Sequence, residues 1–149
     1  MSYMTWIVHG YGICVDDIKT TAEKLLKLAS MDKDVLKDVR EYLDAIYPNG
    51  YNDEDLTIDD FNELEGDYCE KGIAYVLYQV IDNDIPIEFA YDYYGVQYIL
   101  YTPTYPWFIT DTDRTLTEED VENMFKKYVK ILTDEDINID YYSVENGGW

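Results

Sequence analysis

The chain has 149 residues, 47% of them hydrophobic, and 32 acidic against 11 basic residues give a formal net charge of −21. This length suits one domain that can bury roughly two-thirds of its unfolded surface. The aromatic content of 16%, including 17 tyrosines, excludes a disordered acidic tail, and the charge argues against direct binding to nucleic acid or an anionic membrane.

The first predicted element is a strand over residues 3–17. The stretch YMTWIVHGYGICVDD alternates imperfectly and is rich in β-branched and aromatic side chains. Gly10 and Gly12 predict a bend or a bulge within it. Asp16 or Asp17 is then expected to cap a helix. The apolar stripe of that helix would consist of Ile18, Ala22, Leu25, Leu26 and Ala29.

Two further helical patterns follow. Asp32 is a candidate cap for the first, which should end at the YPNG stretch of residues 47–50. Its predicted inward residues are Val35, Leu36, Val39, Leu43 and Ile46. Thr57 and Asp60 have the spacing of a capping box before a short helix, with Phe61 and Leu64 facing inward.

Asp67 and Glu70 repeat the capping spacing before a longer predicted helix. Its apolar residues are Ile73, Val76, Leu77, Val80 and Ile81. The period then changes to alternation, which predicts two strands joined near Gly95. Ile87, Phe89 and Tyr91 should share one face of the first strand, and Val96, Tyr98 and Leu100 alternate along the second.

The last part of the chain begins with a proline-interrupted connection over residues 101–115. Thr117, with Asp120, is expected to cap the final helix, and residues 137–144 predict a last strand. The stripe of that helix is Val121, Met124, Phe125, Tyr128, Val129 and Leu132. The chain is therefore predicted to be one α+β domain over residues 1–149, roughly β-α-α-α-α-β-β-α-β, with a small, mainly antiparallel sheet packed by helices.

Targeting and redox signals are few. The N-terminus lacks a basic region followed by a long apolar core, and no run approaches 18 apolar residues. Cys14 and Cys69 are too few for a disulfide scaffold, and their apolar contexts predict buried free thiols in a reducing compartment. These features predict a cytoplasmic protein.

No motif marks a catalytic or cofactor site. His9, the one histidine, lies five residues from Cys14, which puts the two on opposite faces of a regular strand. The chain has no P-loop and no nucleophile elbow. Among 32 acidic residues, close carboxylate pairs arise by chance, so no pair marks an acid–base site. We expect a protein that is not an enzyme and that needs no cofactor.

Two acidic segments resemble calcium loops by spacing. Their oxygen-bearing side chains are Asp111, Asp113, Thr115 and Glu122 in one, and Asp134, Asp136, Asn138 and Glu145 in the other. Both lack the glycine that the sharp turn of such a loop requires at its sixth position. Each segment also has a better interpretation as a helix start or a strand, so no metal site is expected.

The negative charge is unevenly distributed. Residues 1–50 hold eight acidic and six basic residues, whereas residues 51–149 hold 24 acidic and five basic ones. Residues 51–70 alone carry nine carboxylates and no Lys or Arg. Carboxylates in first helical turns complement the helix dipole, but this explains only some of the excess. The candidate partner-binding residues are Asp53, Glu54, Asp55, Asp59, Asp60, Glu63, Glu65 and Asp67.

Such an array can imitate a nucleic acid. Duplex DNA presents about one negative charge per 1.7 Å of axis, and carboxylates spaced at several ångströms can occupy the same basic groove. Tyrosines beside the charges can add contacts to arginine, although many must pack in the core. The candidates are Tyr51, Tyr68, Tyr91, Tyr93, Tyr94, Tyr141 and Tyr142.

In its overall character, the chain resembles phage-type DNA-mimic inhibitors, including anti-CRISPR and anti-restriction proteins. The resemblance implies a non-enzymatic inhibitor that binds the basic nucleic-acid-binding cleft of a bacterial defence nuclease, such as a CRISPR effector, in the host cytoplasm. Toxin-immunity proteins share this character, so an immunity protein against a basic nuclease toxin is the alternative. A calcium-binding protein or carboxylate-based enzyme is a third, less favoured, class.

Overall fold

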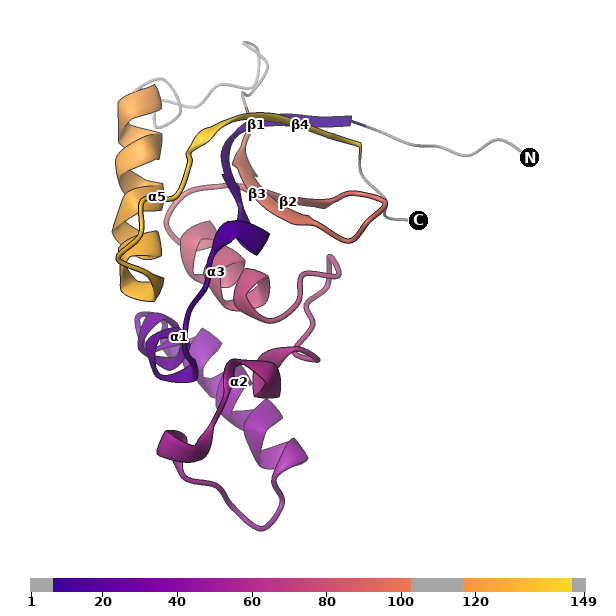
Figure 1. Ribbon diagram of the computed structural model, residues 1–149, viewed down its shortest axis with the longest axis vertical. Coiled ribbons are helices and arrows are strands. Elements are labelled where there is room, and N and C mark those ends of the chain that lie inside the picture. Colours follow the sequence, from indigo (N-terminus) through magenta and orange to yellow (C-terminus); the bar gives the residue numbers. More distant parts are fainter. Residues whose placement is uncertain (1–6, 103–116, 146–149) are drawn as a thin grey trace, which may run out of the picture.

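The computed structural model describes residues 7–102 and 117–145, which form an α+β fold (Figure 1). The prediction of this fold class is confirmed. The strands are β1 (Ile7–Cys14), β2 (Glu88–Tyr91), β3 (Gln97–Tyr101) and β4 (Asp140–Glu145). The α-helices are α1 (Ala22–Ala29), α2 (Lys33–Ile46), α3 (Ile73–Asp82) and α5 (Glu118–Leu132). Short 3₁₀ turns occur at Val15–Asp17, Asp53–Asp55 and Ile58–Phe61.

The four strands form one antiparallel sheet in the order β2-β3-β1-β4. Strand β1 is bent (Figure 1), as predicted, but it contains no bulge, because its pairing with β3 and β4 runs in unbroken register. Gly12 pairs with Leu100 of β3, and a Cβ atom added to Gly12 would lie 2.1 Å from the carbonyl oxygen of Ile99. The glycine therefore permits an unusually close approach of the two strands.

The helices lie on one side of the sheet (Figure 1). The face toward them contributes Ile13, Phe89 and Ile99 to the main core, together with apolar residues of all four helices. On the opposite face, a second buried cluster contains Val8, Ala90, Leu100 and Val144, with Tyr98 and Tyr142 packed against it. Successive side chains along the strands therefore pack alternately into two separate apolar clusters, one on each face of the sheet.

Helix α1 begins later than predicted. Its N-cap is Thr21, whose hydroxyl accepts a hydrogen bond from the main-chain N–H of Lys24, whereas Asp16 and Asp17 lie in a 3₁₀ turn. Helix α2 begins after Asp32, as predicted, and the Asp32 carboxylate accepts from the N–H groups of the next turn. In α2, Leu36 is only half-buried and Ile46 is 40% exposed, so the buried stripe is narrower than predicted.

The segment between α2 and α3 departs most from the predicted helices. The Thr57–Asp60 capping box is present, but it begins a four-residue 3₁₀ turn rather than an α-helix. The predicted cap of α3 is wrong: the helix begins at Ile73 after Gly72, which has φ = +61°. Glu70 is instead fully buried, and Asp67 lies in an exposed turn.

The end of the fold follows the pattern predicted from sequence. Thr117 and Asp120 form the capping box of α5, and every residue of its predicted stripe is buried. The predicted last strand is β4, although it begins at Asp140. Most of the proline-interrupted connection, residues 103–115, lies outside the described residues. Within the described ranges, no helix is both long and apolar enough to cross a membrane.

Candidate functional site

The acidic segment of residues 51–70 is anchored by its apolar side chains. Phe61 is fully buried and Leu64 is 5% exposed, as predicted, and the half-buried Leu56 and Ile58 also pack against the main core. In Figure 1 the 51–61 part of the segment lies beside α2, at the end of the molecule away from the sheet. The segment is therefore held in place while its carboxylates remain at the surface.

Asp53 has an internal partner. Its two carboxylate oxygens accept hydrogen bonds from the Arg40 guanidinium at 2.7 and 2.9 Å. The same guanidinium donates to the Tyr51 hydroxyl at 3.1 Å. The bond from Arg40 lowers the pKa of Asp53 below its ordinary value. Asp53 was expected to carry charge that folding does not explain, and this expectation is wrong, because its charge joins the segment to α2.

Asp60 is also used within the fold. Its carboxylate accepts hydrogen bonds from the Tyr47 hydroxyl and from the main-chain N–H of Thr57, the latter at 2.7 Å. These two bonds, with that from Tyr47 the stronger cause, lower the pKa of Asp60. Asp60 therefore closes the turn that follows α2.

Six of the eight predicted binding carboxylates are exposed and form no ion pair with the described residues. Within residues 7–102 and 117–145, the ion pairs are Arg40–Asp53, Lys37–Glu41 and Lys126–Glu122. The six carboxylates outside these pairs and outside the Asp60 turn are Glu54, Asp55, Asp59, Glu63, Glu65 and Asp67. We call these six residues the acidic surface.

The acidic surface is spread over the segment rather than gathered at one point. Glu54 lines a hollow of about 490 Å³ together with Asp53 and Glu23, which bring three carboxylates to the start of α1. Glu63 lies near the hydroxyl of Tyr42, whose pKa is raised by burial and then by that carboxylate. Such spacing along a chain segment suits a broad electrostatic contact better than a single ion site.

The candidate tyrosine anchors divide into two groups. Tyr68, Tyr93, Tyr94 and Tyr141 are exposed, with exposed fractions between 52% and 93%. Tyr51, Tyr91 and Tyr142 are half-buried, and Tyr51 is occupied by Arg40, which lies 6.0 Å from its ring centroid. The exposed group keeps more than half of its side-chain surface at the exterior, although Tyr93 and Tyr141 also donate hydrogen bonds to Glu145 and Glu118.

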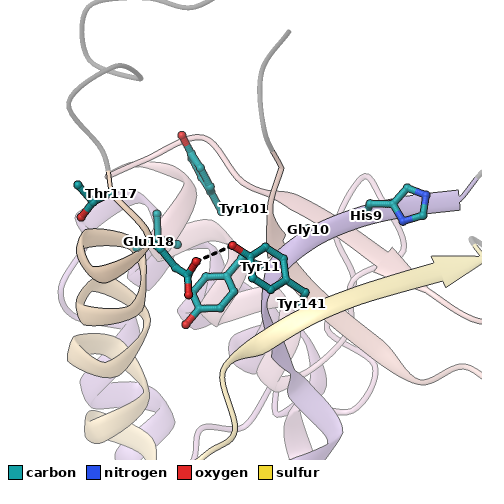
Figure 2. A pocket seen from close by; sticks show the side chains of 8 residues that line it. His9, Gly10, Tyr11, Tyr101, Thr117, Glu118 and Tyr141 are labelled. Carbon is teal, nitrogen blue, oxygen red and sulfur yellow. Dashed lines mark hydrogen bonds between the residues drawn. The ribbon is translucent and has the colours of Figure 1, made fainter. Parts of the chain in front are cut away.

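A second candidate site lies at the other end of the molecule, between β1, β4 and the start of α5 (Figure 2). It is a pocket of about 210 Å³, and we call it the tyrosine pocket. Its walls include Tyr11, Tyr101, Tyr141 and Glu118. The rings of Tyr11 and Tyr141 lie 4.8 Å apart, and the Tyr141 hydroxyl donates to Glu118 Oε2 at 2.6 Å.

The tyrosine pocket is electronegative. Burial raises the pKa of Tyr11, and the carboxylates of Glu122, Glu118 and Asp140 raise it further, while Lys126 acts in the opposite direction. The hydrogen bond to Glu118 is the main cause of the raised pKa of Tyr141. Of these wall residues, only Tyr141 was predicted as a contact, because the others come together through strand order and the position of α5.

His9 and Cys14 lie on opposite faces of β1, as predicted. His9 is exposed at the edge of the tyrosine pocket, and its Nδ1 atom lies 2.6 Å from Ser143 Oγ. Cys14 is buried, and burial raises the pKa of its thiol. The prediction of a buried thiol is wrong for Cys69, which is exposed and has a left-handed backbone with φ = +68°.

The acidic residues of the two calcium-like segments that the structure describes lie in helix α5, in strand β4 and in the connection between them. Glu122 pairs with Lys126 within α5, and Glu145 is in β4, where it accepts from Tyr93 at 3.4 Å. Residues 111–116 of the first segment are outside the described ranges. In the part of the chain that the structure describes, no three or more His, Cys, Asp or Glu side chains gather as a metal site.

Comparison with known proteins provides no family for this chain: no family model, curated protein or solved structure matches it.

Proposed function

We propose that this protein is a non-enzymatic inhibitor that binds the basic nucleic-acid-binding cleft of a bacterial defence nuclease, such as a CRISPR effector, in the host cytoplasm. The observation that supports the proposal is the acidic surface, six exposed carboxylates on a segment that the core holds in place. Carboxylates fixed in this way can take the positions of phosphates and release the cations that phosphates would release.

Self-repulsion among these groups is a cost that folding does not require. No Lys or Arg interrupts residues 51–70, and Lys71 immediately after them forms no ion pair with the described residues. A positive partner surface would relieve the repulsion on binding. The charge would also speed association with such a partner and repel free nucleic acid.

The proposal is tested by measuring binding of the full chain to purified CRISPR effectors, restriction endonucleases and nuclease toxins at several salt concentrations. The test variant combines Glu54→Gln, Asp55→Asn and Asp59→Asn, which lie on the acidic surface. The matched control combines Asp134→Asn, Glu135→Gln and Asp136→Asn, three exposed carboxylates beyond α5. Both variants lose the same number of Asp and Glu charges.

A nuclease of the predicted class should bind more weakly as salt rises, and should lose nuclease activity when bound. The test variant should bind at least about tenfold more weakly, while the control should change affinity by about threefold or less. Absence of binding across the panel at low salt would overturn the proposal, and so would equal losses in the two variants. Binding only to nuclease toxins would favour the immunity function instead.

A further inference from the structure

The tyrosine pocket has the chemistry of a receptor for an organic cation. Tyr11, Tyr101 and Tyr141 line it, and cations are attracted to the faces of aromatic rings within about 6 Å of the centroid. Glu118 adds a formal negative charge between α5 and β4 (Figure 2). Its Oε2 atom accepts from Tyr141, whereas its Oε1 atom accepts no hydrogen bond from the described residues. Among the described residues, this carboxylate oxygen therefore has no donor of its own.

An anion does not suit this position, even though a helix begins there. The first turn of α5 contains Glu118, Glu119 and Asp120, so its dipole is already compensated by negative side chains. Glu122 and Asp140 act electrostatically on Tyr11 in the pocket wall. The local charge, like that of the whole chain, therefore favours a cation.

The size of the pocket indicates that its ligand is a single side chain of a partner. A volume of about 210 Å³ is below the range of roughly 300–1,000 Å³ typical of pockets for whole cofactors or drug-sized molecules. A guanidinium group fits these walls better than an ammonium group, because it is planar, stacks on aromatic rings and carries several donors in fixed directions. Glu118 Oε1 and the Tyr141 hydroxyl oxygen supply acceptors for those donors.

We propose that the tyrosine pocket receives the guanidinium group of an arginine on the basic protein partner. This inference rests on the proposed function, since a nucleic-acid-binding cleft is a surface rich in arginine. It adds a second point of contact to the acidic surface. The acidic surface would supply long-range attraction, and the pocket would supply a directional contact that fixes orientation.

The test uses the isotope-labelled full chain and three small probes, followed by nuclear magnetic resonance. The probes are Nα-acetyl-arginine amide, the corresponding citrulline amide, which has nearly the same shape without the charge, and the corresponding lysine amide. The arginine probe should shift the signals of Tyr11, Tyr141 and Val121 to saturation. The citrulline and lysine probes should bind at least about tenfold more weakly.

Two pairs of variants locate the contact. Glu118→Gln and Tyr141→Ala should each weaken binding of the arginine probe by at least about fivefold. Their matched controls are Glu119→Gln, which removes a neighbouring charge outside the pocket, and Tyr94→Ala, which removes a tyrosine that is 93% exposed. The control variants should bind the probe as the unmodified chain does, and an unchanged amide spectrum elsewhere shows that each variant is folded.

The pocket proposal is overturned if the arginine probe produces no saturable shifts, if citrulline or lysine binds equally well, or if the pocket variants behave like their controls. Its failure is separable from that of the proposed function. If the arginine probe binds but no nuclease does, the pocket proposal stands and the proposed inhibitor function is rejected. If a nuclease binds, Tyr141→Ala leaves that binding unchanged and the arginine probe causes no shifts, the inhibitor function stands and the pocket proposal is rejected.

Discussion

At the scale of single residues, neighbouring acidic side chains have different roles. Asp53 forms a two-point contact with Arg40, whereas the adjacent Glu54 has no ion pair with the described residues. Asp53→Asn should lower the free energy of unfolding by about 1 kcal/mol at neutral pH, because a charge-assisted pair at a half-exposed site is lost. Glu54→Gln should leave it unchanged or raise it slightly. Urea unfolding of the two variants measures the difference.

The contribution of Asp53 should also depend on pH. Arg40 holds the folded-state pKa of this carboxyl below its ordinary value of 3.8. Its stabilisation is therefore fully present above the unfolded pKa and is lost as pH falls through the lower, folded value. The stability difference between the unmodified chain and Asp53→Asn should shrink toward zero on acidification. A difference that stays constant down to about pH 2 would contradict the assignment.

Gly12 provides a test of backbone packing. A methyl group at this position would lie within 2.1 Å of the Ile99 carbonyl oxygen, so β1 and β3 would have to separate. Gly12→Ala should cost about 2–4 kcal/mol of unfolding free energy. Gly50→Ala is the control, since Gly50 has φ = +90° with no atom within 4 Å of an added Cβ, and it should cost only about 1 kcal/mol, the penalty of a left-handed backbone. Thermal unfolding measures both losses of stability, and equal losses for the two variants would show that the close contact between β1 and β3 has no special role.

At the scale of elements, Glu70 connects the acidic segment to α3. Its oxygens accept from the Tyr68 N–H at 2.9 Å and from Gln79 Nε2 at 3.2 Å, and the residue is fully buried. Glu70→Ala should therefore destabilise the protein by about 1–2 kcal/mol, since it leaves two partly buried donors without their acceptor. Asp67→Ala, at the exposed turn, should change stability by less than about 0.5 kcal/mol. Chemical denaturation distinguishes these outcomes, and equal effects would contradict the different roles of the two residues.

Helix starts were predictable where the signal is local. Thr57–Asp60 and Thr117–Asp120 form capping boxes because both partners lie within one turn of the chain. The prediction failed at Asp16, whose carboxylate accepts from the N–H of Gln97 at the start of β3. A contact between residues 81 positions apart leaves no local pattern, so Thr21 was missed as the cap of α1.

At the scale of the whole molecule, the charge should make stability depend on salt. A net charge of −21 disfavours the compact state through self-repulsion. Raising potassium chloride from about 20 to about 300 mM should therefore raise the midpoint of thermal unfolding, because screening weakens this repulsion. The triple variant at Glu54, Asp55 and Asp59 should have a higher unfolding midpoint at low salt, and its midpoint should rise less as salt is added. A midpoint that falls with salt would show that attractive ion pairs outweigh the repulsion.

Composition and periodicity by themselves determined the fold class, the buried stripe of α5 and the presence of an anchored acidic segment, because the residue patterns that predict these features lie within a few residues of one another. Tertiary structure decided which carboxylates are used within the fold: Arg40 of α2 binds Asp53, and Tyr47, just after α2, donates to Asp60. It also assembled the tyrosine pocket, where Tyr11 of β1 meets Glu118 of α5 and Tyr141 of β4, more than 100 residues later in the chain. Such a site exists only after antiparallel pairing places β4 beside β1 and packing brings α5 against them, and neither arrangement is encoded in local spacing.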